Sequence, residues 1–184
     1  MSRHVSSSAA LPIAYVVLRI LIVLNWFFGA CILGLLVFTF VNEPWTMKAL
    51  GVTGMPDAQG VMMGMRAVAA LGVVAIVLNY GVLKRLLTIV ETVRAGDPFV
   101  AANAFRLHAI AWILVGLQLL SLAIAAIGKI ISTAEHPFEL DAGFSVNGWL
   151  AVLLMFVLAR VFAEGTLMRE DLEGTVCPWP SPSP

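Results

Sequence analysis

Long apolar stretches alternate with short polar connections along the whole chain. Four of them are long enough to cross a hydrocarbon layer about 30 Å thick as helices of roughly 20 residues, namely residues 12–41, 60–83, 108–131 and 147–167. Each must be helical, because unpaired peptide groups are costly in hydrocarbon and the short alternating segments of a barrel are missing. The pattern predicts an all-α polytopic membrane protein, a four-helix bundle of transmembrane helices.

Composition places the chain in lipid rather than in water. About 60% of its 184 residues are hydrophobic and 12% are charged, whereas a soluble domain averages roughly a quarter charged. The 11 basic and 11 acidic side chains cancel, so no net positive field attracts nucleic acid. We interpret residues 1–176 as a single four-helix transmembrane domain and the Pro-rich residues 177–184 as a disordered tail.

The apolar pattern changes between the second and third spans. From Val82 to Val93 apolar residues recur every three or four positions with charged residues between them, which is typical of an amphipathic helix. Gly96 suits a left-handed turn after this helix, Asp97 suits the N-cap of the next helix, and Pro98 suits its first position. The sequence therefore predicts an amphipathic helical hairpin between spans 2 and 3.

Lysine and arginine residues outside the spans predict an orientation. On the side of the hairpin and the termini lie Arg3, Lys84, Arg85, Arg94, Arg106 and Arg169, and on the other side lie Lys48 and Lys129. Cytoplasmic segments of membrane proteins carry the excess of positive residues. We therefore expect the hairpin and both termini to be cytoplasmic.

Ionisable side chains inside the spans are costly and require partners. Arg19 and Arg160 fall at similar depths in the first and last spans, and Glu164 is four residues from Arg160, on the same helix face. Asn79 and Tyr80 fall near this level in the second span. We expect these five residues to form a polar cluster in which Glu164 bridges both guanidinium groups. Alternatively, each arginine extends to lipid phosphates.

Other residues within the spans have simpler interpretations. Arg66, near the outer end of its span, is expected to extend to the headgroups, and Gln118 to hydrogen-bond a neighbouring helix. The spacing of Gly60 and Gly64 permits close approach of another helix. Cys31 ends a run that weakly resembles a lipoprotein cleavage site, but the apolar residues continue after it. We expect Cys31 to be a small buried packing residue without a disulfide.

The hairpin carries a candidate docking motif, which consists of Asp97, Pro98, Phe99, Asn103 and Arg106. A basic amphipathic helix either lies on anionic headgroups or offers its apolar face to a partner protein, and the sequence leaves both uses open. In the second case the charged stripe of the last helix, residues 164–173, forms another wall of the site.

No catalytic constellation is visible in the sequence. The three histidines His4, His108 and His136 are scattered, and no His or Cys pair has metal-ligand spacing. We therefore predict a protein that is not an enzyme and that uses no cofactor or metal. One alternative is a cation-binding or pH-sensing site in the outer loops, formed by Glu43, Asp57, Glu135, His136, Glu139 and Asp141.

Two blocks of the chain resemble a known bacterial family, the domain-of-unknown-function family 2975. The blocks are Arg94-Ala95-Gly96-Asp97-Pro98-Phe99-Val100-Ala101-Ala102-Asn103 with Arg106-Leu107, and residues 157–165 with Leu167 and residues 169–176. The resemblance implies a four-span inner-membrane protein without a catalytic residue to transfer. It also implies a genetic association with a small Xre-type helix-turn-helix regulator, and hence a membrane protein that tethers or restrains a DNA-binding protein.

The leading hypothesis is a non-enzymatic regulatory membrane protein that docks such a regulator without binding nucleic acid itself. The main alternative is a small channel or transporter in which Arg19, Arg160 and Glu164 line an anion or proton path. A purely structural or lipid-interacting protein is the third. The expected partners are the lipid bilayer, the regulator and further copies of the chain.

Overall fold

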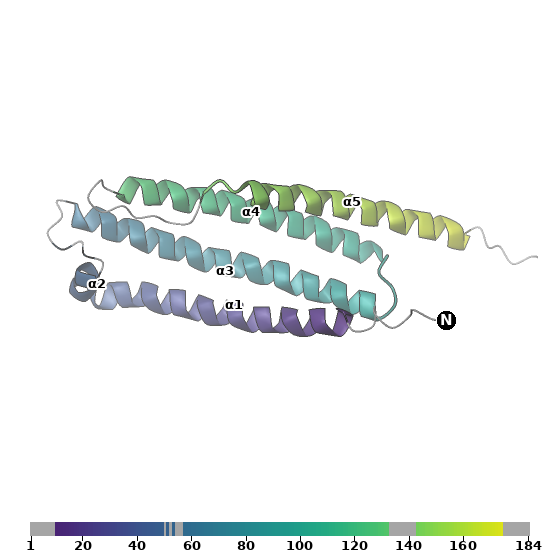
Figure 1. The fold of residues 1–184 in the computed structure, drawn as a ribbon, viewed down its shortest axis with the longest axis horizontal. Coiled ribbons are helices and arrows are strands. Elements are labelled where there is room, and N and C mark those ends of the chain that lie inside the picture. Colours follow the sequence, from purple (N-terminus) through teal and green to yellow (C-terminus); the bar gives the residue numbers. More distant parts are fainter. Residues whose placement is uncertain (1–9, 50, 52, 54–56, 133–142, 175–184) are drawn as a thin grey trace, which may run out of the picture.

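Four long helices and one short helix make up the computed structural model (Figure 1), which describes residues 10–49, 51, 53, 57–132 and 143–174. The helices are α1 (Ala10–Val41), α2 (Glu43–Ala49), α3 (Ala58–Arg94), α4 (Ala101–Ile131) and α5 (Val146–Gly174). No strand occurs among these described residues. The prediction of an all-helical fold is confirmed, and α1, α3, α4 and α5 are each long and apolar enough to cross a membrane.

The long helices pack side by side in chain order. The substantial contacts join α1 to α3, α3 to α4 and α4 to α5, and Figure 1 shows the same order of neighbours across the molecule. The four helices therefore form an open row rather than a closed bundle. Because α1 and α5 lie at opposite edges of this row, their polar residues are held apart within one chain.

The helix α3 continues without interruption through the second span and the amphipathic segment beyond it. Its 37 residues extend about 55 Å at about 1.5 Å per residue. Gly96 follows with φ at 88°, which confirms the predicted left-handed turn. The prediction that Asp97 caps the next helix and Pro98 begins it is wrong, because α4 starts at Ala101 and its N-cap residue, Val100, makes no side-chain cap.

Small residues allow α3 to lie close to α4. A Cβ atom added to Gly64 would overlap Cγ2 of Ile131 and would lie 3.6 Å from Cγ2 of Ile127. The predicted close approach at Gly64 therefore occurs, and it occurs against α4. Gly60 has a different role, because its N–H donates to the Asp57 carboxylate that caps α3.

Replacing Gly64 by leucine is expected to push α3 and α4 apart. Ile131 is β-branched and stiff, so relief requires a backbone shift, and overpacking of this kind costs about 1–3 kcal/mol. We expect a lower midpoint in thermal unfolding of the detergent-solubilised chain. Gly34→Leu is the control, since nothing lies within 4 Å of a Cβ at Gly34. Equal losses in the two variants would contradict the close contact.

The helix α5 is displaced lengthwise relative to α4. Just before α5, the Gly143 N–H donates to the Ser121 hydroxyl at 3.0 Å, and that hydroxyl donates back to the Gly143 carbonyl at 3.2 Å. Gly148 then packs against the Gln118 amide. Since α4 continues from Ser121 to Ile131, about 15 Å further, α5 starts near the middle of α4. Figure 1 shows α5 extending well past the opposite end of α4.

Candidate functional site

A buried asparagine holds the hairpin together. Asn103 is 0% exposed. Its Nδ2 donates to Thr92 Oγ1 at 2.7 Å and to Pro98 O at 3.0 Å, while its Oδ1 accepts from Arg106 Nη1 at 2.7 Å. These bonds offset the cost of burying a polar amide. Asn103 therefore ties the end of α3, the turn and the start of α4 to one another.

The turn is also attached to α5. Asp97 forms an ion pair with Arg169, and the rings of Phe99 and Phe162 lie 5.4 Å apart. A Cβ atom added to Gly165 would lie 3.1 Å from the Phe99 ring, so the glycine lets the ring approach the α5 backbone. We call the whole set the bracket; it consists of Asp97, Phe99, Asn103, Arg106, Phe162 and Arg169.

The candidate docking motif is thus brought together, but it is not a free surface. Asn103 is buried, the Pro98 carbonyl accepts from Asn103, and Asp97 is paired with Arg169. Phe99 retains 44% exposure while it packs on Phe162. Asp97 and Phe99 therefore attach the turn to α5, whereas Pro98, Asn103 and Arg106 bond to one another within the hairpin.

An apolar groove lies beside the bracket, between α4 and α5. It has a volume of about 350 Å³ and is lined by Ala101, Ala104, Phe105, Ala159, Ala163, Thr166 and Leu167. The small alanine side chains leave space between the helices, and Phe105 and Leu167 are 74% and 59% exposed. Sequence reasoning missed this groove. The available signal was the four-residue spacing of Ala159 and Ala163 on α5.

The predicted polar cluster does not assemble within one chain. Arg160 Nε pairs with Glu164 Oε1 at 2.7 Å, and these side chains are 79% and 56% exposed on α5. Arg19, at the opposite edge of the row, lies over the Tyr15 ring at 5.1 Å. The prediction that Glu164 bridges both guanidinium groups is therefore wrong for a single chain.

Asn79 and Tyr80 also lie away from Arg19. The Tyr80 ring packs on Trp26 with 5.4 Å between ring centres, and Trp26 is seven residues, about 10 Å, further along α1 than Arg19. Asn79 is exposed and donates to the Ala75 carbonyl of its own helix at 3.1 Å. The expected common level fails because packing contacts set the offset between α1 and α3, which hydropathy alone does not show.

At the other end of the row, Arg66 joins α3 to the end of α1. Its Nη2 donates to Thr39 O at 2.6 Å and to Glu43 Oε2 at 3.2 Å, its Nε donates to Thr39 Oγ1 at 3.4 Å, and its guanidinium lies 4.3 Å from the centre of the Phe40 ring. The last carbonyl groups of a helix lack intrahelical partners, and Arg66 supplies one to α1. The prediction that Arg66 extends to the headgroups is wrong, because its side chain is only 20% exposed.

Two acidic residues of the alternative outer site have other partners. Glu43 pairs with Arg66, and Asp57 caps α3. Within the described ranges no group of three His, Cys, Asp or Glu side chains gathers in a metal-binding arrangement. Outside the described residues lie Glu135, His136, Glu139, Asp141 and the predicted tail 177–184. Cys31 is exposed on α1, so the prediction that it is buried is wrong.

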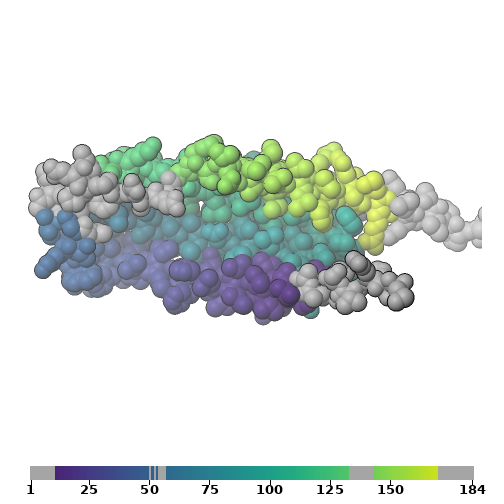
Figure 2. Space-filling view, viewed as in Figure 1, coloured from purple at the N-terminus to yellow at the C-terminus, as the bar shows by residue number. Residues whose placement is uncertain are grey.

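The sides of the row are apolar. Large exposed side chains on α1 include Ile20, Val23, Phe27, Leu35 and Phe40, and Figure 2 shows the elongated body that the packed helices form. Lipid solvates such a surface, whereas in water it would promote aggregation. A row of four apolar helices with polar contacts at both ends defines a multi-pass α-helical membrane protein.

Comparison with known protein families identifies the family of the chain. Residues 41–176 match the family described as protein of unknown function, DUF2975. The match covers most of the chain, and the protein belongs to this family, as the two sequence blocks indicated. No curated protein and no solved structure matches the chain. The function therefore has to be inferred from the contacts described above.

Proposed function

We propose that this protein is a non-enzymatic regulatory protein of the bacterial inner membrane, and that the groove between α4 and α5 docks a helix of a cytosolic regulator. The observation that carries the proposal is the groove itself, about 350 Å³ of apolar space flanked by the exposed side chains of Phe105 and Leu167. Amphipathic helices bind such grooves through apolar residues at three- and four-residue spacing. Because the bracket already holds α4 and α5 together, little ordering is needed on binding.

The distribution of charge supports a cytoplasmic position for the groove. The positive residues at the hairpin end of the described helices are Lys84, Arg85, Arg94, Arg106 and Arg169, and those at the other end include Lys48 and Lys129. An excess of this kind favours the cytoplasmic side, where a soluble partner reaches the groove. The family resemblance implies a helix-turn-helix regulator as that partner, and tethering it requires no contact between this chain and DNA.

Serine substitutions beside the groove test the proposal. In the Phe105→Ser/Leu167→Ser double variant we expect recovery of the regulator with the solubilised chain to fall at least about tenfold, because each buried large apolar side chain contributes about 1.5–3 kcal/mol. The matched control, Ile130→Ser/Phe144→Ser, changes side chains that are 81% and 71% exposed near the end of α4 and just before α5. Undiminished recovery with the groove variant, or an equal loss with the control, would count against docking at this groove.

Transport is the competing function, and its test can overturn the docking proposal. The Arg160–Glu164 pair is exposed on α5, at the edge of the open row, so a path lined by these residues would require several copies of the chain. Flux into liposomes that depends on Arg160 and survives the groove substitutions would support a channel. Together with undiminished recovery of the regulator, it would overturn the proposal.

A further inference from the structure

Tyr15, near the start of α1, has two arginines over its ring. The guanidinium carbon of Arg19 lies 5.1 Å from the ring centre, and that of Arg94, at the end of α3, lies 4.9 Å from it. The two guanidinium groups are therefore no more than about 10 Å apart. Because an aromatic face attracts cations, the Tyr15 ring keeps two like charges within this distance of each other.

Neither arginine has a carboxylate partner in the described part of the chain. The ion pairs there join Arg66 to Glu43, Arg160 to Glu164 and Arg169 to Asp97. Glu91 lies on α3 one turn before Arg94 and is exposed, but it forms none of these pairs. The sequence of residues 1–9 contains Arg3 and His4 and no Asp or Glu. An anion from outside the chain would therefore relieve the repulsion between the two arginines.

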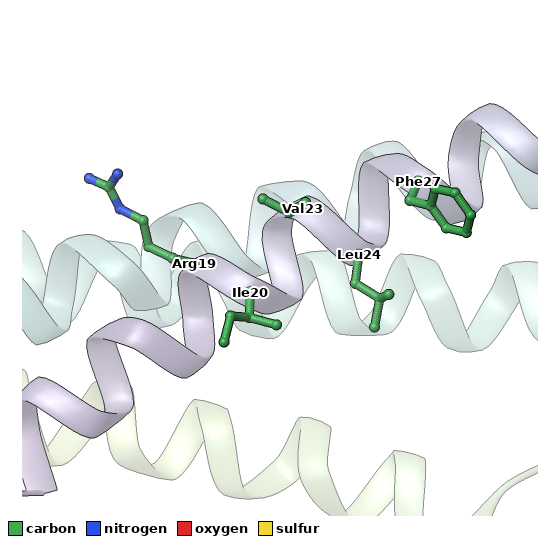
Figure 3. A pocket seen from close by; sticks show the side chains of 5 residues that line it. All are labelled: Arg19, Ile20, Val23, Leu24 and Phe27. Atoms are coloured by element: carbon green, nitrogen blue, oxygen red, sulfur yellow. The ribbon is translucent and has the colours of Figure 1, made fainter.

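A shallow apolar groove begins at Arg19 and runs along α1. It has a volume of about 410 Å³ and is lined by Arg19, Ile20, Val23, Leu24 and Phe27. Figure 3 shows the Arg19 guanidinium at one end of this row of side chains and the Phe27 ring at the other. The two residues are eight positions, about 12 Å, apart along the helix. A groove of this shape and polarity fits a hydrocarbon chain and offers little to a free ion.

The two arginines lie where lipid headgroups are expected. On α3 the apolar span of residues 60–83 ends before Arg85, and at about 1.5 Å per residue it is long enough to cross a hydrocarbon core of about 30 Å. Arg94 lies beyond Arg85, outside this core, and its contact with Tyr15 places the start of α1 at the same level. Arg19 is one turn further along α1, within reach of the phosphate layer because arginine side chains are long.

We propose that Arg19, Arg94 and Tyr15 bind the phosphate of an anionic phospholipid, with one acyl chain lying in the groove that ends at Phe27. The phosphate oxygens accept hydrogen bonds from both guanidinium groups, a geometry that arginine favours. The ring of Tyr15 keeps the two groups together in the absence of lipid. This site lies on α1 and α3, at the opposite edge of the row from the groove between α4 and α5, and does not depend on the docking proposal.

Native mass spectrometry of the detergent-solubilised full chain distinguishes binding of a phospholipid from binding of free phosphate. The probes are dioleoyl phosphatidylglycerol, dioleoyl phosphatidylcholine and inorganic phosphate, each added alone. We expect phosphatidylglycerol to bind at least about tenfold more tightly than either of the others, because it alone combines net negative charge with a chain for the groove. Equal binding of the two lipids, or equally tight binding of inorganic phosphate, would overturn the proposal.

Substitutions in the site test whether the lipid binds at Arg19, Arg94 and Tyr15. Arg94→Gln and Tyr15→Leu are each expected to weaken binding of phosphatidylglycerol about tenfold. The matched control is Arg160→Gln, which removes an exposed arginine from the opposite edge of the row. Its effect is expected to stay within about twofold, because charges separated by more than a Debye length are screened. Equal losses in Arg94→Gln and Arg160→Gln would show diffuse attraction and contradict a defined site.

Val23→Trp tests the groove without changing the charge. The larger side chain fills the space for the acyl chain, so we expect phosphatidylglycerol to bind at least about threefold more weakly. Thermal melting of each variant shows whether it is folded, and Val23→Trp decides the proposal if the other variants do not fold. Unchanged affinity in Val23→Trp would overturn the assignment of the acyl chain to this groove.

Discussion

Leucine in place of Asn103 is expected to lower the free energy of unfolding by about 2–3 kcal/mol, because the buried Asn103 amide makes three side-chain hydrogen bonds and each contributes about 0.5–1.5 kcal/mol. Leucine has a similar volume, but it leaves Pro98 O and Arg106 Nη1 without the hydrogen bonds that Asn103 makes, and it removes the bond to Thr92. The measurement is a titration of the purified chain from mild detergent into SDS, followed by circular dichroism.

Two further variants test whether the loss of stability comes from the hydrogen bonds of Asn103. Asn79→Leu is the matched control, since Asn79 is exposed and bonds only its own helix in the described contacts; surface changes of this kind stay within about 0.5 kcal/mol. Asn103→Asp keeps an acceptor for Arg106 but removes both donated bonds, so we expect a loss close to that of leucine. If Asn103→Leu proves as stable as Asn79→Leu, the central position of Asn103 in the bracket is wrong.

The bracket also matters for the groove between α4 and α5. Ala101 and Ala104 of the groove lie on the first turn of α4, next to Asn103, and Ala163 lies next to Phe162 on α5. Loss of the contacts at Asn103 and Phe162 therefore acts on both walls of the groove. The predicted docking motif therefore supports the walls of the groove between α4 and α5.

The helices were predictable because the evidence for them is local. The length of an apolar run decides whether a helix can cross a bilayer, and the glycine at position 96 was sufficient to predict the left-handed turn. The hairpin contact between Thr92 and Asn103, only 11 residues apart, was also within reach of such reasoning. The second span and the amphipathic segment after it form one continuous helix, α3.

The site was harder to predict because its contacts are distant in sequence. Asp97 suited a helix cap by its position, but its partner, Arg169, lies 72 residues away. The predicted polar cluster assumed that residues at equal depth in their spans lie at the same level. This assumption fails for α5, which begins beside Gln118 rather than beside the end of α4. In addition, the order of helix contacts places Arg19 and Arg160, which have similar nominal depths, on helices at opposite edges of the row. Hydropathy gives the length of each helix but neither its neighbours nor its offset.

Arg66→Leu is expected to lower the free energy of unfolding by about 3 kcal/mol, mainly through the bond to the Thr39 carbonyl. Hydrogen bonds to charged groups contribute about 1.5–3 kcal/mol each, and the position over the Phe40 ring adds about 0.5–1 kcal/mol. The Glu43 side chain is 42% exposed, so its ion pair contributes less, at most about 1 kcal/mol. The measurement is the same SDS titration.

Conservative and charge-matched variants show whether the geometry of Arg66 or only its charge matters. Arg66→Lys keeps the charge, but a single ammonium group cannot reach Thr39 O, Thr39 Oγ1 and Glu43 with the fork that the guanidinium provides. We therefore expect lysine to restore less than half of the lost stability, and Glu43→Gln to cost about 0.5 kcal/mol. Arg160→Leu removes an arginine whose pair is exposed, and its expected cost is also within about 0.5 kcal/mol. Full restoration by lysine would mean that the charge alone stabilises this end of the row, and an equal loss in Arg160→Leu would mean that the contacts with α1 contribute nothing specific.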